Sequence, residues 1–253
     1  MISDPGFYAI AVPAVLLVGL SKGGFLGGMA ILGVPLLALA IPPVQAAAIL
    51  LPILIAMDVI GVWAYRRSFD KANLMIMVPA ATVGVAVGWL TAAYVSEGHV
   101  RLIVGLVALA FTLDHWLGIR PRKEAPGPDP LKGGFWGALA GFTSFVSHAG
   151  SPPVQIYMLP QRLERTIYVG TSVMFFALVN LIKVPPYFLL GQFSGQNLAT
   201  TAVLLPVAPL AMALGIFLVH RVPQEPFYRI AYACVFLVSL KLIWDGARAL
   251  LGL

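Results

Sequence analysis

Charged side chains and cysteine are both scarce in this chain. Only 10% of its 253 residues are Asp, Glu, Lys or Arg, whereas 60% are hydrophobic and the mean hydropathy is +0.92. Because a soluble domain carries about 25% charged residues, this composition excludes an ordinary soluble fold and predicts an all-α polytopic membrane protein. The single cysteine, Cys234, excludes a disulfide framework and a cysteine-based metal or cluster site.

Motifs for ATP hydrolysis and for metal-dependent catalysis are also missing. The sequence has no Gly-x-x-x-x-Gly-Lys-Ser/Thr phosphate loop and no polar segment long enough for a nucleotide-binding domain. Its four histidines form no HExxH zinc motif, and the side chains of the adjacent Ser147 and His148 diverge on most backbones. We therefore expect no enzyme, no cofactor, no metal and no nucleic-acid partner, with the lipid bilayer as the surroundings.

Six continuous apolar runs are close to the ~20 residues that cross a bilayer. They cover residues 44–65, 74–95, 100–119, 167–190, 198–219 and 227–251. Two further regions, 7–41 and 133–159, are too long or too broken for one straight crossing, and each contains a glycine-rich interruption. Each of these two regions could be a kinked helix or a hairpin.

The distribution of basic residues favours the hairpins. The connections at 41–45 and 191–197 carry no Lys or Arg. Basic residues fall in four other connections, namely Arg66, Arg67 and Lys71; Arg120, Arg122, Lys123 and Lys132; Arg162 and Arg165; and Arg221. The positive-inside rule places all four in the cytoplasm, and a single crossing at 133–159 would move two of them outside.

Two hairpins give about ten helical segments, and eight is the count if both regions are kinked spans. Ten segments divide into a first transmembrane repeat over 1–119 and a second over 133–253, joined by a polar, proline-rich cytoplasmic linker over 120–132. A repeat with five crossings must be inverted relative to its partner. Paired interruptions of hydrophobic segments are typical of secondary transporters, because unwound backbone at membrane depth must line a polar cavity.

The interruptions have a characteristic sequence. The first half contains Gly-Leu-Ser-Lys-Gly-Gly-Phe-Leu-Gly-Gly, followed by Gly-Val-Pro-Leu-Leu, and the second contains Gly-Phe-Thr-Ser-Phe-Val-Ser-His-Ala-Gly-Ser-Pro-Pro-Val-Gln, followed by Leu-Pro-Gln. With these motifs nearly the whole chain resembles the TauE/SafE sulfite exporter family, also called the toluene sulfonate uptake permease family. The resemblance implies a multi-pass carrier in the bacterial inner membrane for sulfite, sulfoacetate or other sulfonates. The family is usually described with about eight spans.

The first interruption offers a cationic site for such an anion. Lys22 is flanked by Ser21, Gly23 and Gly24, and a charge at membrane depth is expensive enough to indicate function. The glycines allow backbone N–H groups to point at the three oxygens of a sulfite or sulfonate. The alternative interpretation is that Lys22 extends to an interface and that the glycines serve close helix packing.

The second interruption offers neutral hydrogen-bond donors. Ser147, His148, Ser151 and Gln155 supply hydroxyl, imidazole and amide groups. His148 can also take up a proton near neutral pH, which suits coupling of transport to protons. Alternatively, His148 satisfies only a neighbour's hydrogen bond.

Three further polar residues lie in apolar runs. Asn180 and Lys183 are three apart and share one helix face. Asp58, at the matching place in the first half, can pair with Lys22 or Lys183, or carry a coupling proton. The coupling ion of such a carrier is a proton or another ion. A purely structural ion pair is the alternative.

Taken together, the residues predict a secondary transporter of small sulfur-containing anions that works by alternating access at the two broken helices. An anion channel with the same constriction, or a carrier of small carboxylate-type anions, is the alternative.

Overall fold

The computed structural model describes residues 1–25, 28–91, 94, 96–117 and 125–251, and every regular element in these ranges is helical. This agrees with the predicted all-α class. The first half contains α1 (Pro5–Lys22), η1 (Met29–Leu32), α2 (Gly33–Leu37), α3 (Pro43–Tyr65), α4 (Lys71–Thr91) and α5 (Glu97–Leu117). The second contains α6 (Pro130–Ser147), α7 (Ser151–Met158), η2 (Leu159–Gln161), α8 (Arg165–Leu189), α9 (Gly195–Leu204), α10 (Val207–Arg221) and α11 (Gln224–Leu251).

Side-chain caps explain where several helices begin. Asp4 accepts a hydrogen bond from the backbone N–H of Gly6, and Asp129 accepts two from the first turn of α6. Both helices then start with proline, whose missing N–H has no partner to lose at that position. Glu164 caps α8, because its side chain accepts hydrogen bonds from the backbone N–H groups of Thr166 and Ile167.

Among the described residues, six helices are long and apolar enough to cross a membrane: α1, α3, α4, α5, α8 and α11. The apolar run over 198–219 forms two helices, α9 and α10, which are bent by 47° relative to each other. Pro206 lies at the bend and cannot donate the backbone hydrogen bond that would continue α9. If the bent pair is one span, the count is seven.

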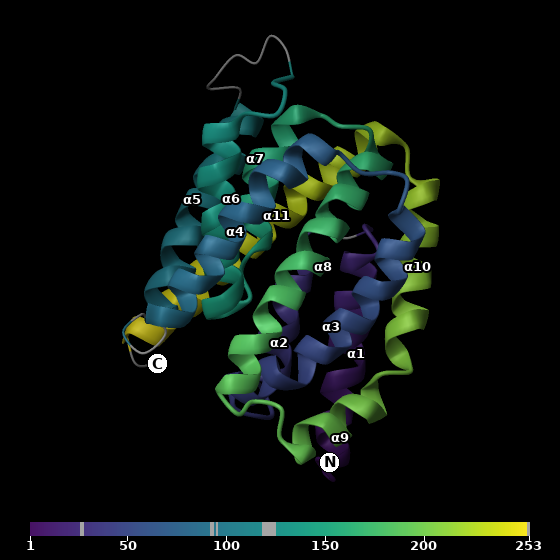
Figure 1. The fold of residues 1–253 in the computed structure, drawn as a ribbon, viewed down its shortest axis with the longest axis vertical. Coiled ribbons are helices and arrows are strands. Elements are labelled where there is room, and N and C mark those ends of the chain that lie inside the picture. The colour runs from purple at the N-terminus through teal and green to yellow at the C-terminus, as the bar shows by residue number, and fades with distance from the viewer. Residues whose placement is uncertain (26–27, 92–93, 95, 118–124, 252–253) are drawn as a thin grey trace.

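Both interrupted regions are hairpins. After Lys22 the chain returns along α1 through η1 and α2, so that Gly33 lies against Val18. In the second hairpin the hydroxyl of Tyr157, near the end of α7, lies 3.1 Å from the backbone nitrogen of Asp129, just before α6. Each hairpin therefore enters and leaves at the same end of the bundle (Figure 1). With each return arm and the α9–α10 pair taken as one, the described helices form the ten segments expected from the sequence.

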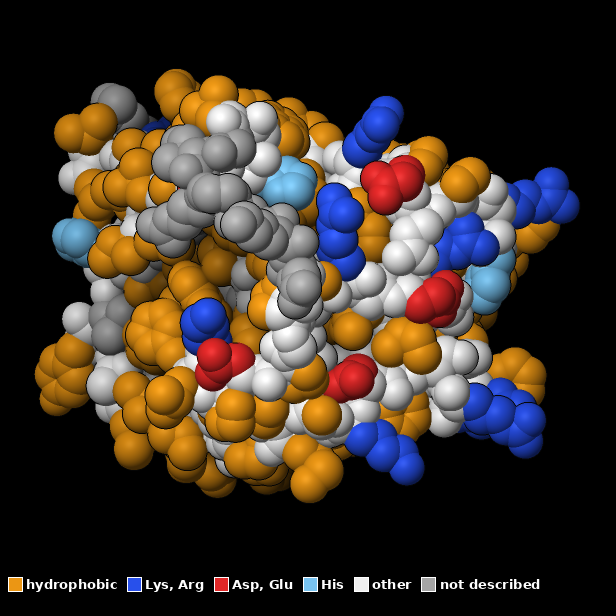
Figure 2. Space-filling model, turned by 90° about the horizontal axis from the view of Figure 1, so that it is seen from above, with side chains coloured by type: hydrophobic (Ala, Val, Ile, Leu, Met, Phe, Trp, Pro, Cys, Tyr) orange, Lys and Arg blue, Asp and Glu red, His pale blue; other side chains and the backbone are white. Residues whose placement is uncertain are grey.

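The basic connections gather at one end of the molecule, which we call the basic end (top of Figure 1). Arg165 donates to the carbonyl of His220, and Tyr228 donates to the carbonyl of Leu163, so the connections before α8 and α11 adjoin. Figure 2 looks onto this end and shows most of its Lys and Arg side chains in the right-hand half of the view, with apolar side chains prevailing on the left. Arg120, Arg122 and Lys123 fall outside the described residues.

The uncharged connections lie at the opposite end. The backbone N–H of Ile2 donates to Thr200, and Gln45 donates to Asn197. This end therefore holds the start of the chain, the α2–α3 connection and the start of α9, which have no Lys or Arg among the described residues. The segregation of charge agrees with the topology expected from the positive-inside rule.

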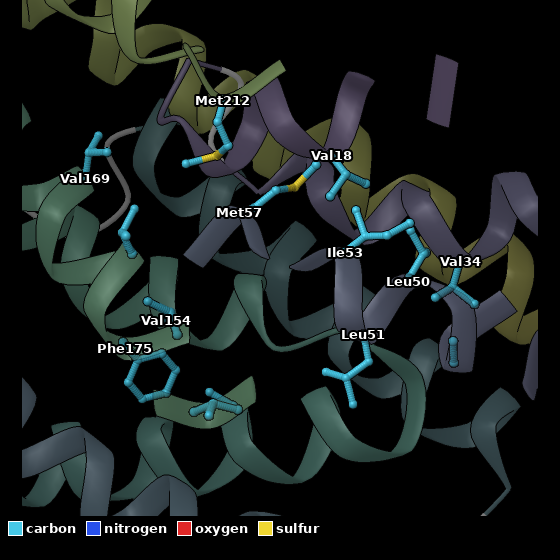
Figure 3. Close-up of a cluster of buried hydrophobic side chains, with 14 of the residues drawn as sticks. Val18, Val34, Leu50, Leu51, Ile53, Met57, Val154, Val169, Phe175 and Met212 are labelled. Atoms are coloured by element: carbon cyan, nitrogen blue, oxygen red, sulfur yellow. The ribbon is translucent and has the colours of Figure 1, made fainter. Parts of the chain in front are cut away.

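Small residues and a central apolar cluster hold the bundle together. Residues from α1, α2, α3, α7, α8 and α10 meet in this cluster, which includes Val18, Leu50, Met57 and Phe175 (Figure 3). Between α4 and α6, a Cβ added to Gly84 would lie 1.9 Å from the carbonyl oxygen of Ala138. The two helices can approach this closely only because that position has no side chain.

Candidate functional site

Two neighbouring cavities lie where the hairpin turns meet α8. The first cavity has a volume of about 60 Å³ and is lined by Ser21, Lys22, Gly24, Gly28, Ala30, Ser151, Val154, Gln155, Tyr168, Val169, Ser172, Val173 and Phe176. The second cavity has a volume of about 70 Å³ and is lined by Val18, Lys22, Ala30, Ile31, Val34, Leu50, Leu54, Ser144, His148, Gly150, Ser151, Phe176, Asn180 and Lys183. Residues from both interruptions thus face common space.

A buried ionic group stands beside both cavities. The Nζ atom of Lys22 lies 2.5 Å from Oδ1 of Asp58, and the other carboxylate oxygen accepts a 2.7 Å hydrogen bond from the amide of Asn180. The side chain of Asp58 is 5% exposed and that of Lys22 is 9% exposed. Both carboxylate oxygens of Asp58 therefore have partners, and its charge is compensated. The pairing with Lys22 is one of the two that the sequence suggested.

Lys183 is the exception among the buried charges. Lys183 is 1% exposed, and its Nζ atom donates a hydrogen bond to the hydroxyl of Ser144 at 3.1 Å. Within the described part of the chain, no carboxylate forms an ion pair with Lys183. Two buried lysines therefore face the second cavity beside a single buried carboxylate, and an anion in that cavity would supply the missing charge.

The turn of the first hairpin is shaped by glycine and by a serine. Gly28 has a φ of 88°, and a Cβ at this position would lie 2.6 Å from Nε2 of Gln155. The hydroxyl of Ser21 accepts a hydrogen bond from the backbone N–H of Ala30, which ties the end of α1 to η1. The Oε1 atom of Gln155 is buried and has no hydrogen-bond partner among the described residues. The first cavity therefore contains an unsatisfied polar group.

A tyrosine hydroxyl holds each hairpin turn. Tyr65, at the end of α3, donates to the carbonyl of Gly23 at 2.8 Å, and Tyr187 of α8 lies 2.7 Å from Nε2 of His148. Tyr187 follows Tyr65 by 122 residues, the separation that also relates Asn180 to Asp58. Equivalent positions of α3 and α8 thus make equivalent contacts.

The structure brings together most, though not all, of the predicted site residues. The cavity linings include Ser21, Lys22, Gly24, His148, Ser151, Gln155, Asn180 and Lys183. Gly23 instead packs on Gly215, and the hydroxyl of Ser147 donates to the carbonyl of Thr143 on its own helix. Asp58 contacts Lys22 without lining either cavity.

Sequence reasoning missed Ser144, Tyr168, Ser172, Phe176 and Tyr187. Ser172, Phe176, Asn180, Lys183 and Tyr187 recur at spacings of three or four residues and therefore form one face of α8. That periodicity was available in the sequence, because Asn180 and Lys183 had already marked the face. Ser144 carries no comparable signal.

Chemically, this arrangement suits recognition of a small anion. Lysine, hydroxyl and amide groups can donate to oxyanion oxygens, and backbone atoms of the turns add further polar contacts. Among the described residues, no three His, Cys, Asp or Glu side chains gather as metal ligands.

The family model described as sulfite exporter TauE/SafE matches residues 11–242. This range includes both hairpin turns and every lining residue of the two cavities. Comparisons with curated proteins and with solved structures give no match.

Proposed function

The chain belongs to the TauE/SafE sulfite exporter family, a family of membrane transporters, and on that basis we propose that it carries sulfite or a related sulfonate through the two cavities. The observation that carries the proposal is that the buried Lys183 forms no ion pair with a carboxylate in the described part of the chain. Lys183 faces the same cavity as Lys22, His148 and Asn180, so a monovalent or divalent oxyanion would find both charge and hydrogen-bond donors there.

The proposed mechanism is alternating access between two inverted repeats. The packing of helices supports it, because α4 packs on α6 as α10 packs on α1, while α3 packs on α8 and α5 on α11. Exchanging the two halves therefore maps these contacts onto one another. The matched contacts of Tyr65 and Tyr187 with the two turns support the same relation. Rocking of one half against the other would expose the site to each side in turn.

Orientation and coupling follow from charge. We place the protein in a bacterial inner membrane with its basic end on the cytoplasmic side, because Lys and Arg concentrate at that end. His148 and Asp58 are the proposed proton carriers, since the half-buried His148 lines the same cavity as Lys183 and the buried Asp58 contacts Lys22.

The experiment is uptake of radiolabelled sulfite by proteoliposomes, with and without a proton gradient. We expect saturable, gradient-sensitive flux that is lost in Lys183→Met. The matched control is Lys132→Met, because Lys132 is an exposed lysine paired with Asp129 at the basic end. Flux that does not saturate would indicate a channel, and acetate flux in place of sulfite flux would indicate a carboxylate carrier. Normal sulfite flux in Lys183→Met would contradict the site.

A further inference from the structure

The two cavities are adjacent compartments with a shared wall. Lys22, Ala30, Ser151 and Phe176 line both, and the remaining lining residues belong to only one. The first cavity reaches Tyr168 near the start of α8, and the second reaches Lys183. At ~1.5 Å per residue, Phe176 lies about 12 Å along α8 from Tyr168 and about 10 Å from Lys183. The wall is therefore midway along the helix.

Phe176 is the bulky member of this wall. Its ring edge reaches the turn of the second hairpin, where a Cβ added to Gly150 would lie 3.2 Å from Cε1 of Phe176. Its ring also contacts Phe175 edge-on, with centroids 5.2 Å apart. The Phe176 ring can change its position by rotation about χ1, whereas the small side chains of Ala30 and Ser151 cannot open or close a passage in this way.

The compartments differ in charge. In the first cavity, Lys22 is neutralised by Asp58, and the other polar groups include Ser21, Ser172 and Gln155. The second cavity holds Lys183, whose buried charge has no carboxylate partner in the described part of the chain. Each cavity is several times the roughly 10–15 Å³ that a single water needs, which leaves room for one small oxyanion.

We propose that the two cavities are successive stations for the anion, a weaker one at Lys22 and a stronger one at Lys183, with Phe176 as the gate between them. The inference rests on the proposed function, because it takes the ligand to be an oxyanion. In this proposal the anion binds at two positions in turn, not at a single central site. The uncharged side chain of Phe176 controls whether the anion passes from one position to the other.

Thiol labelling tests the gate without any substrate. In a Cys234→Ser background, Ser172→Cys places a thiol in the first cavity and Leu54→Cys places one in the second. Membrane-impermeant thiol reagents are applied to right-side-out and inside-out vesicles. We expect Ser172→Cys to react chiefly from the face that carries the basic end and Leu54→Cys chiefly from the other face. Adding Phe176→Ala should abolish this sidedness for both thiols.

Matched variants keep the result interpretable. If Phe176→Ala does not fold, Phe176→Leu is the milder substitution, and it should weaken the sidedness of labelling. Phe175→Leu is the control, because Phe175 is fully buried in the core and lines neither cavity. Labelling of both thiols from one face, or sidedness that survives both Phe176 variants, would overturn the gate even if sulfite flux is normal. Absence of sulfite flux would instead affect only the proposed function.

Ligand protection tests the stations separately. Methanesulfonate, which does not consume the thiol reagent, should slow labelling of both cysteines. We expect Lys183→Met to remove protection of Leu54→Cys while that of Ser172→Cys persists. Equal loss at both positions would show a single shared site and overturn the two-station path.

Discussion

The two hairpin turns differ in the charged side chains that lie beside them. The first turn brings its own cation, Lys22, and neutralises it with Asp58. The second turn contributes His148 and lies beside Lys183 of α8, which has no carboxylate partner among the described residues. Each turn is held by a tyrosine hydroxyl from an equivalent position.

This difference in charge arises at two positions where the halves of the chain carry different residues. Asp58 and Asn180 occupy equivalent positions on α3 and α8 and bond to each other, yet only one of them carries charge. Replacing carboxylate by amide in one half leaves the central group with one positive charge in excess.

The largest expected effect is a difference in protein stability between variants of the two buried lysines, Lys22 and Lys183. Lys22→Met leaves Asp58 buried without its cation and should lower the free energy of unfolding by about 3–5 kcal/mol. Lys183→Met removes a charge that has no carboxylate partner in the described structure and should not lower it. Unfolding in detergent, followed by circular dichroism, gives both values.

The double variant Lys22→Met with Asp58→Asn removes both charges of the pair and should recover much of the loss. A loss as large for Lys183→Met as for Lys22→Met would show that Lys183 is compensated and would remove the contrast between the turns.

A smaller effect concerns the turn backbones. Gly28→Ala forces a left-handed residue, which costs about 1–2 kcal/mol, and also drives a Cβ against Gln155. Gly134→Ala is the matched control, because this helical position of α6 has no atom within 4 Å of an added Cβ and should gain up to ~1 kcal/mol. The second turn already accommodates a positive φ of 54° at His148. Thermal unfolding of the two alanine variants should therefore shift in opposite directions.

The tyrosine contacts should contribute alike. Tyr65→Phe and Tyr187→Phe each delete one hydroxyl and should each lower the free energy of unfolding by about 1 kcal/mol. Tyr94→Phe is the control, since Tyr94 is 90% exposed. Strongly unequal losses for the two buried positions would break the equivalence of the turns.

The smallest effect lies outside the turns, at the cap of α8. Partial burial raises the pKa of Glu164, but hydrogen bonds from Thr166 and Ile167 outweigh it and lower the pKa below its usual 4.5. The cap therefore adds stability above about pH 4.5 and loses it as the pH falls through the lowered pKa. Wild type should lose more stability than Glu164→Gln between pH 6 and pH 3. Identical pH profiles would show that the cap does not contribute.

Much of the site was predictable because polar residues in apolar runs have few explanations. Lys22, His148, Asn180 and Lys183 stand out for that reason, and the structure places all four at the second cavity. Phe176 did not stand out, because an aromatic residue in an apolar helix has no distinguishing chemistry. Ser147 did stand out, yet its hydroxyl bonds within its own helix.

Composition and the two glycine-rich motifs were sufficient for the all-α membrane class and for the family, because both depend on residue types and their order along the chain. Only the tertiary structure decided that Lys22 has a carboxylate partner while Lys183 has none among the described residues, and that Phe176 lines two neighbouring cavities. Those facts depend on which side chains from distant segments meet, and local sequence does not encode such meetings.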